Sequence, residues 1–345
     1  MKILLIAIVG SKNFGDEAMF KAIYKSLIDR GHSVTVATYE VEEAKKRFPD
    51  VKFIKIPTTS LKNLVIELSG FSTLGLDISA FDALYISGGG NLNSLYPFHV
   101  VNIFSMVREF RKKGKYVEFR PQSVGPFYGK TRILIEHLVN KIVKMSDVFY
   151  VRELLSYEYL RKKHQNVKLS KADAWYIPTD GSVFLLRGRY VGLCVRPWKD
   201  EEVLIDYVAR LVSYLKERGY EPLFIPIAYG GTRKYIDNEF LKGKVYGTFL
   251  SDIVEIENLT PEMIKGVIAK CCFTIGMSYH FNIFSLSTGV PSAAVYMEDY
   301  YRIKNLGVYK AFGNPELVFK IPDTSPKHLV DRMINEINGR QGGSK

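Results

Sequence analysis

His280 is the residue of this sequence whose position best suits acid–base chemistry. It comes three residues after the apolar run Phe273–Met277 and opens His280–Ser287, which has the apolar character of a short buried helix. Such a residue lies at the carboxyl end of a strand and at the positive start of a helix, which disfavours a protonated imidazole unless an anion binds nearby. A lone histidine is more often structural, but this position favours a catalytic role.

Glycine-rich and acidic segments follow other predicted strands. Asn13-Phe14-Gly15-Asp16-Glu17 follows the first strand, and Gly88-Gly89-Gly90-Asn91 follows the strand Ala83–Ser87. Three glycines let a backbone approach a ligand closely and offer N–H groups to an anion, although they could equally form a tight turn. Asp16 is a candidate base, but it could also cap a helix whose first turn contains Glu17.

Two arginines come directly after predicted strands, and a glutamine lies three residues beyond another. Arg152 follows Val148–Val151, Arg196 follows Val191–Val195, and Gln122 follows the fifth strand. An arginine at the end of a strand can clamp a carboxylate or a phosphate, or it can pair with an acidic neighbour. Both interpretations stay open for Arg152 and Arg196.

The elements that must position these residues are short apolar runs that alternate with amphipathic stretches, a pattern typical of a parallel βαβ sheet. Such a pattern predicts an α/β protein with two doubly wound, Rossmann-like domains facing each other across a cleft. Because ligands of open parallel sheets bind outside the carboxyl ends of the strands, the residues above would gather at the edges that face the cleft. The predicted strands are Ile3–Val9, Ser33–Thr38, Val51–Ile56, Ala83–Ser87, Tyr116–Phe119, Val148–Val151, Val191–Val195, Pro222–Ile227, Phe273–Met277 and Pro291–Tyr296.

The domain boundary is expected between Ile177 and Arg189, where Pro178, Gly181 and Gly188 interrupt the pattern. We expect residues 1–180 to form the first domain and residues 188–325 the second. A terminal helix over 326–338 and a flexible tail over 339–345 would complete the chain.

Composition limits the environment and the partners. The 345 residues carry a net charge of +12, which suits a nucleic acid, an anionic membrane surface or a phosphorylated substrate. No nucleic-acid-binding signature accompanies the charge, so nucleic acid is not expected. Three cysteines without a CxxC pair favour a reducing, cytoplasmic location without a structural metal. No run reaches the roughly 18–20 apolar residues of a membrane span, although the amphipathic stretch Leu61–Leu76 could touch lipid or simply pack on its sheet.

Several of these segments together resemble the polysaccharide pyruvyl transferases. They occur in the order of that family and span most of the chain, and the ordered set is more specific than any single segment. The resemblance implies a GT-B-like fold. The segments are Asn13-Phe14-Gly15-Asp16-Glu17, Gly88-Gly89-Gly90-Asn91-Leu92, Gln122-Ser123-Val124-Gly125-Pro126, Val151-Arg152-Glu153 with Ser156, Ala172-Asp173, Val195-Arg196-Pro197-Trp198, and Gly276-Met277 through His280 to Gly289-Val290-Pro291.

The resemblance also implies transfer of a pyruvyl group from phosphoenolpyruvate onto two hydroxyls of a sugar, forming a ketal. The acceptor would be a cell-surface glycan or its lipid-linked precursor, reached by peripheral contact with an anionic membrane. No cofactor or metal is expected beyond the co-substrate. His280 would be the proton donor and Asp16 the sugar-side base. Donor-binding candidates in the two domains are Arg152, Arg196, Ser278, Gly88, Gly89, Gly90, Arg302 and Lys304, and acceptor-binding candidates are Asn13, Gly15, Glu17, Asn91 and Gln122.

Two departures from the family pattern concern the donor. The family usually has Gly-Met-Arg-Leu-His, with the arginine gripping the donor, where this chain has Ser278 two residues before His280. A lysine usually follows the last strand, where this chain has Asp299-Tyr300, with Arg302 and Lys304 further on. Neighbouring cations could substitute, the donor could differ, or transfer could be lost.

Two alternatives therefore stay open beside pyruvyl transfer. One is a GT-B-type glycosyltransferase that binds a nucleotide sugar near His280, using Gly230-Gly231-Thr232-Arg233-Lys234. The other is a non-catalytic protein that binds a glycan or a membrane with an inherited fold.

Overall fold

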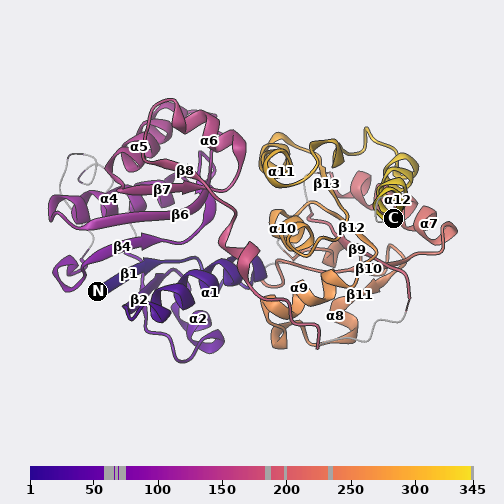
Figure 1. Cartoon of the computed structure of the whole chain (residues 1–345), viewed down its shortest axis with the longest axis horizontal. Helices are drawn as coiled ribbons and strands as arrows, with labels where there is room; N and C mark the ends of the chain where they lie inside the picture. The colour runs from indigo at the N-terminus through magenta and orange to yellow at the C-terminus, as the bar shows by residue number, and fades with distance from the viewer. Residues whose placement is uncertain are drawn as a thin grey trace. The chain divides into compact units, whose positions relative to one another are not determined.

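The computed structural model of the chain describes residues 1–57, 66, 69, 75–182, 188–197, 200–231 and 236–342 (Figure 1). Most of Leu61–Leu76 and the residues 232–234 lie outside these ranges, so the expectations for them are not taken up again. The chain divides into two compact units. The first unit consists of Met1–Ser11 and Met19–Asp173, and the second of Lys12–Ala18 and Ala174–Lys345.

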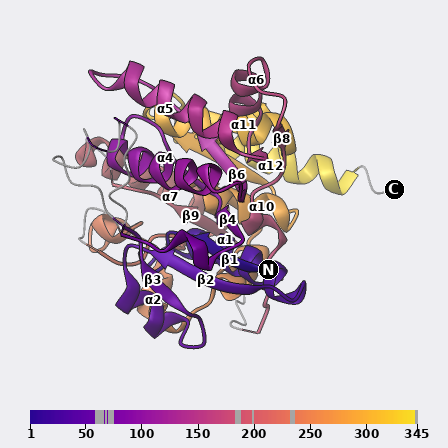
Figure 2. The same cartoon turned by 90° about the vertical axis from the view of Figure 1, so that its left-hand side faces the viewer.

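The first unit is a parallel sheet covered by helices on both faces. In Figure 1, α4, α5 and α6 lie on one face and α1 and α2 on the other, and Figure 2 shows the same layers after a quarter turn. The strand order is β3-β2-β1-β4-β6-β7-β8, and β5 pairs with β6. Its strands are β1 (Lys2–Ile6), β2 (Ser33–Thr38), β3 (Phe53–Lys55), β4 (Ala83–Ile86), β5 (Gly89–Leu92), β6 (Tyr116–Val124), β7 (Val148–Val151) and β8 (Val167–Leu169). Its helices are α1 (Phe14–Asp29), α2 (Val41–Arg47), α4 (Pro97–Lys112), α5 (Arg132–Met145) and α6 (Leu154–Arg161).

Apolar patterning explains these elements. Ile3 to Ile6 of β1 are all buried, as expected for a central strand that is covered on both faces. On α5, a one-sided apolar stripe packs toward the sheet and α4. The stripe consists of Ile135, Leu138, Val139, Ile142 and Val143.

The second unit repeats the doubly wound plan. Its strands are parallel and have the order β11-β10-β9-β12-β13-β14. Successive strands are added on one side from β9 to β11 and on the other side from β12 to β14, so the strand order reverses between β9 and β12. Helices α7 and α12 pack on each other, and α10 packs against both α9 and α11. The strands are β9 (Tyr190–Cys194), β10 (Glu221–Phe224), β11 (Thr248–Phe249), β12 (Phe273–Gly276), β13 (Ser292–Tyr296) and β14 (Val318–Lys320). The helices are α7 (Glu201–Glu217), α8 (Leu250–Ile253), α9 (Pro261–Ala269), α10 (Tyr279–Ser287), α11 (Asp299–Phe312) and α12 (Pro326–Gly342).

The predicted class, two doubly wound α/β sheets, is confirmed, and the differences are local. The change of unit falls at Asp173–Ala174, before the expected boundary, and the segment Lys12–Ala18 belongs to the second unit. The terminal helix continues to Gly342, beyond its expected end at residue 338. Across the described residues, no helix is both long and apolar enough to span a membrane.

Candidate active site

His280 is the second residue of α10 and lies four residues beyond Gly276, the last residue of β12. It is almost completely buried, with 8% of its surface exposed. The strand enters the helix through Gly276, where a Cβ atom would lie 2.3 Å from Cδ1 of Phe281. Only glycine fits this approach between strand and helix. The residue therefore occupies the predicted position at a strand end and a helix start.

Arg196 and Ser278 leave neighbouring strands at the same level. Gly276 of β12 pairs with Cys194 of β9, and the Met277 N–H donates to the Cys194 carbonyl at 2.8 Å. These two strands flank the point where the strand order reverses, which is where doubly wound sheets bind ligands. Arg196 and Ser278 thus each lie two residues beyond a directly paired position of the two strands.

The segment Asn13–Glu17 forms the first turn of α1 and packs within the second unit. The Asn13 Oδ1 accepts the N–H groups of Gly15 at 2.9 Å and Asp16 at 3.3 Å, so Asn13 caps the helix. The alternative interpretation of Asp16 as the cap is therefore wrong. The Phe14 N–H donates to the Ile227 carbonyl at 3.0 Å, which attaches the turn to the segment after β10.

Gly15 lies directly against the imidazole of His280. A Cβ atom at residue 15 would lie 2.1 Å from Nδ1, 2.2 Å from Cγ and 2.5 Å from Cβ of the histidine. Ordinary contact begins at 3.4 Å, so no larger residue fits unless the ring moves. This contact joins two motifs that are far apart in the sequence, and it fixes the place of the ring.

Tyr229, which the sequence did not indicate, holds the same turn. Its ring stacks on Phe14 with a centroid distance of 4.2 Å and an interplanar angle of 25°. Its hydroxyl donates a short hydrogen bond to Glu17, whose surface is only 1% exposed. Glu17 therefore anchors the turn, whereas Asp16 is partly exposed beside Gly15.

Arg196 is fixed by a buried acid that the sequence also did not reveal. Its Nε and Nη2 donate to Asp237 at 2.7 and 3.2 Å, and Asp237 also accepts the N–H groups of Ile227 and Ala228. Burial alone would lower the pKa of Arg196, but Asp237 holds that pKa well above its usual value. Burial raises the pKa of the adjacent Tyr301 to about 12. The result is a guanidinium that stays charged and is oriented by its ion pair with Asp237 at the carboxyl edge.

The other predicted cations of this unit lie on α11. The Lys304 ammonium donates to the Tyr300 hydroxyl and lies 4.0 Å from the centroid of that ring. The Arg302 Nε donates to Asp299 at 2.8 Å. The helix is attached near Ser278, because the Asn305 amide donates to the Met277 carbonyl at 3.2 Å.

In the first unit, Arg152 and Gly88 meet at Met19. Arg152 is 2% exposed, and its Nε donates to the Ser123 hydroxyl at 2.7 Å while its Nη1 lies 3.7 Å from the Met19 sulfur. A Cβ atom at Gly88 would lie 3.0 Å from the same sulfur and 2.9 Å from the Pro121 carbonyl oxygen. The predicted arginine and the first glycine therefore belong to one buried cluster.

Gly89, Gly90 and Asn91 differ from the expected loop, because they lie in strand β5, which pairs with β6. Gln122 also lies inside a strand, since β6 continues to Val124. The Gln122 amide donates to the carbonyls of Ser87 at 2.7 Å and Arg120 at 2.9 Å. Backbone pairing with β6 overrides the weak strand preference of glycine here.

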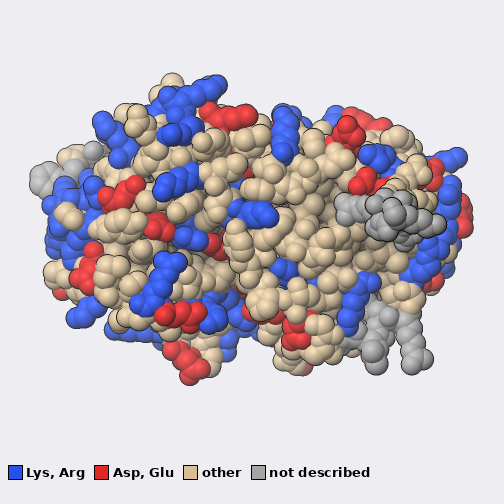
Figure 3. Space-filling model, in the orientation of Figure 1, with Lys and Arg blue, Asp and Glu red and all other residues tan. Residues whose placement is uncertain are grey.

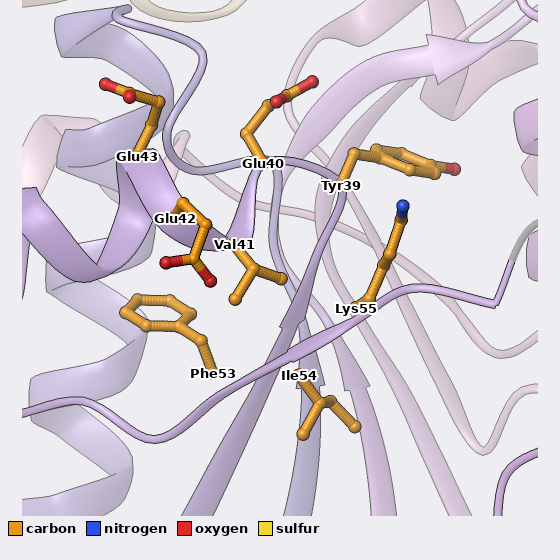
Figure 4. A pocket seen from close by; sticks show the side chains of 8 residues that line it. All are labelled: Tyr39, Glu40, Val41, Glu42, Glu43, Phe53, Ile54 and Lys55. Atoms are coloured by element: carbon orange, nitrogen blue, oxygen red, sulfur yellow. The ribbon is translucent and has the colours of Figure 1, made fainter.

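A pocket of about 720 Å³ lies at the carboxyl ends of β2 and β3 in the first unit (Figure 4). Figure 4 shows the Lys55 ammonium directed toward the ring of Tyr39. The Tyr39 hydroxyl is hydrogen bonded to His99 Nδ1 at 2.9 Å. Nothing in the sequence pattern had indicated this pocket, which is lined by Tyr39, Glu40, Val41, Glu42, Glu43, Phe53, Ile54 and Lys55.

The predicted site residues thus divide between the two units. Searching the described residues for three or more His, Cys, Asp or Glu side chains that could hold a metal finds no such group. The second unit holds Asn13, Gly15, Asp16, Glu17, Arg196, Ser278, His280, Arg302 and Lys304, and the first holds Gly88, Gly89, Gly90, Asn91, Gln122 and Arg152.

Comparison with known families decides the class of protein. The family model "Polysaccharide pyruvyl transferase" matches residues 13–299, which include the Asn13–Glu17 turn and His280. The chain belongs to the polysaccharide pyruvyl transferase family. It is therefore a transferase enzyme that modifies glycans, with a sugar-containing acceptor and a donor. No curated protein matches the chain.

Solved structures with a similar fold are GT-B proteins. A putative UDP-N-acetylglucosamine 2-epimerase from Listeria monocytogenes matches with a TM-score of 0.62 and 10% identity, covering 99% of this chain and 88% of the epimerase. UDP-GlcNAc 2-epimerase from Neisseria meningitidis, bound to UDP-GlcNAc, matches at 0.59 and 11%, covering 99% and 92%. A spinosyn rhamnosyltransferase complexed with spinosyn aglycone matches at 0.53 and 11%, covering 98% and 92%. At these identities the likeness shows the fold alone, and the expected GT-B architecture is confirmed.

Proposed function

We propose that this transferase moves a pyruvyl group from phosphoenolpyruvate onto two hydroxyls of one sugar in a cell-surface glycan or its lipid-linked precursor. Two C–O bonds form at the enol carbon, and the C–O bond to phosphate breaks. One hydroxyl proton ends on the methyl group and the other on the released phosphate. The reaction balances without a redox step, so we expect no cofactor.

His280 is the proposed proton donor to the methylene carbon of phosphoenolpyruvate. Protonation gives the neighbouring carbon cationic character, so that a sugar hydroxyl can attack it. Asp16 is the proposed base for that hydroxyl, because it follows Gly15, whose backbone touches the His280 ring. After phosphate leaves, the second hydroxyl closes the ketal.

The single observation that carries this proposal is the contact of Gly15 with His280. A proton donor must hold its geometry to well below 1 Å to be effective, and a packed backbone is the least mobile support available. The two motifs in this contact both lie within the part of the chain that the family model matches.

Arg196 is the proposed anchor for the donor's anionic groups in place of the missing arginine at residue 278. It leaves β9 beside Ser278, and Asp237 orients its guanidinium. Its side chain is 25% exposed, so it can reach a ligand while paired. A guanidinium suits the bidentate recognition of a carboxylate or a phosphate.

Ligand-dependent thermal unfolding tests the donor. We expect phosphoenolpyruvate at about 100 times its Kd to stabilise the protein by about 2.7 kcal/mol. This corresponds to a rise in Tm of about 5–10 °C for a domain of this size. Phosphoglycerate serves as a control anion of similar charge. A rise with phosphoenolpyruvate no larger than with phosphoglycerate would contradict the proposed donor.

The second candidate is a glycosyltransferase that uses a nucleotide sugar, and it is favoured by the UDP-GlcNAc bound in one structure with the same fold. It predicts stabilisation by UDP- or GDP-sugars without any stabilisation by phosphoenolpyruvate. The same experiment therefore separates the two candidates.

A further inference from the structure

Exposed large hydrophobic side chains gather at one place on the first unit. Of the thirteen such side chains among the described residues, six lie in two short segments, at the start of α4 and around the start of α5. Ile133 is 83% exposed and Phe98 is 48% exposed. The six are Leu95, Tyr96, Phe98, Tyr128, Ile133 and Leu134, and we call them the apolar patch.

The two segments form one surface. The Ser94 N–H donates to the Pro126 carbonyl at 3.3 Å, and the Tyr128 N–H donates to the Ser94 hydroxyl at 3.1 Å. Helices α4 and α5 pack on each other and follow parallel strands on the same face of the sheet, so their first turns lie at the same end. This end is the carboxyl edge of the sheet, where ligands bind.

Positive charge predominates beside the part of the apolar patch that lies on α5. Lys130 and Arg132 are exposed and lie within the second segment, which contains no acidic residue before Glu136. Lys163, two residues after the end of α6, lines a pocket together with Arg132 and Ile133. Figure 3 shows lysine and arginine side chains over α5 and α6.

A shallow pocket of about 570 Å³ adjoins Ile133. Its Arg132 and Lys163 each lie 4.0 Å from Glu136, and Lys163 also lies over the ring of Tyr159 at 5.1 Å. The pocket thus offers two cations to an anionic group beside the most exposed apolar side chain. Its lining residues are Arg132, Ile133, Glu136, His137, Asn140 and Lys163.

We infer that the apolar patch and its basic rim are a docking surface for an anionic lipid bilayer. Aliphatic and aromatic side chains enter the boundary between headgroups and acyl chains, tyrosines favour that boundary, and lysine and arginine attract anionic headgroups. The rim combines Lys130, Arg132 and Lys163 with Glu136, and this net positive charge favours a membrane with anionic lipids. The docking inference rests only on the exposed side chains and basic residues described above. Its use for presenting a lipid-linked acceptor rests on the proposed function.

Flotation with vesicles tests the docking. The full chain is mixed with phosphatidylcholine vesicles with or without phosphatidylglycerol. We expect binding to the anionic vesicles only, and weaker binding as salt increases. The double variant Phe98→Ser/Ile133→Ser should lose about tenfold in affinity for each side chain. Lys130→Glu/Arg132→Glu should lose about fivefold or more for each residue.

Val203→Ser/Ile253→Ser is the control, because these apolar side chains lie on the second unit and are exposed to 45% and 47%, about as much as Phe98. It should bind vesicles like the original protein. Equal binding by the Phe98→Ser/Ile133→Ser variant, or equal binding to vesicles without phosphatidylglycerol, would overturn the inference. The inference would also be overturned if the original protein bound no vesicles and formed a dimer in light scattering that the Phe98→Ser/Ile133→Ser variant did not form. The patch would then join two copies of the chain.

Phosphoenolpyruvate-dependent stabilisation, measured on the same samples, keeps the two proposals apart. We expect it to be unchanged in every patch variant. Vesicle binding without this stabilisation would refute only the proposed donor. Stabilisation without vesicle binding would refute only the docking surface.

Discussion

Replacing Gly15 by alanine tests whether the Gly15–His280 contact positions the catalytic ring. The added Cβ would lie 2.1 Å from Nδ1, so the ring must retreat by about 1.3 Å to reach the ordinary contact distance of 3.4 Å. Overpacking of this kind costs about 1–3 kcal/mol of folding free energy. A displacement of about 1 Å at a reacting group costs about 100-fold in rate.

The assay is phosphate release from phosphoenolpyruvate with a panel of cell-wall glycans and lipid-linked sugar precursors, together with thermal unfolding. We expect Gly15→Ala to lose about 100-fold in kcat while Tm falls by only a few degrees. Gly339→Ala is the matched control, because a Cβ atom there meets open space and the residue also lies in a helix of the second unit. Its activity should be unchanged. A Gly15→Ala protein with full activity and stability would refute the positioning role.

Three further substitutions have defined outcomes. His280→Gln should lower kcat by about 100- to 10,000-fold and leave phosphoenolpyruvate-dependent stabilisation within a few-fold; unchanged kcat would exclude it as the proton donor. Asp237→Ala should cost about 3–5 kcal/mol in urea unfolding, because it leaves Arg196 without its buried partner, and a loss below about 1 kcal/mol would contradict this. Burial lowers the pKa of His99 to about 4. In the unfolded chain the His99 imidazole takes up a proton near pH 6.5, whereas in the folded chain it does so only near pH 4. About 3 kcal/mol of folding stability is therefore lost as the pH falls from 6.5 to 4. His99→Gln should remove this loss, which unfolding measured across the same pH range would show.

The sequence predicted elements well where burial alone determines them. Two predicted strands match β2 and β7 at both ends, namely Ser33–Thr38 and Val148–Val151. A short apolar run between turn residues is buried in a parallel sheet only as a strand. Helix α11 was not predicted. Its buried side chains include Lys304 and Asn305, so it lacks the apolar stripe that periodicity detects.

The candidate site was predictable in its parts but not in its contacts. His280 and Gly15 each follow a strand, which is a local signal. The hydrogen bond of Tyr229 to Glu17 joins residues 212 positions apart, and neither residue type is unusual in its own segment. No apolar periodicity in the sequence around Asp237 indicates that this residue is buried. Pairings of this kind come from the tertiary fold, which a single sequence does not encode locally.

The seven residues Lys12–Ala18 give the second unit a non-contiguous sequence. A fragment that began at Ala174 would leave the Tyr229 ring without Phe14 and the His280 ring without the backbone of Gly15. The half of the gene that encodes the second sheet therefore cannot supply a complete histidine environment by itself. Recombination that exchanged this half between relatives would have to preserve the Asn13–Glu17 turn of the other half as well. The segments that build the histidine environment must therefore be inherited together, although the fold has two halves.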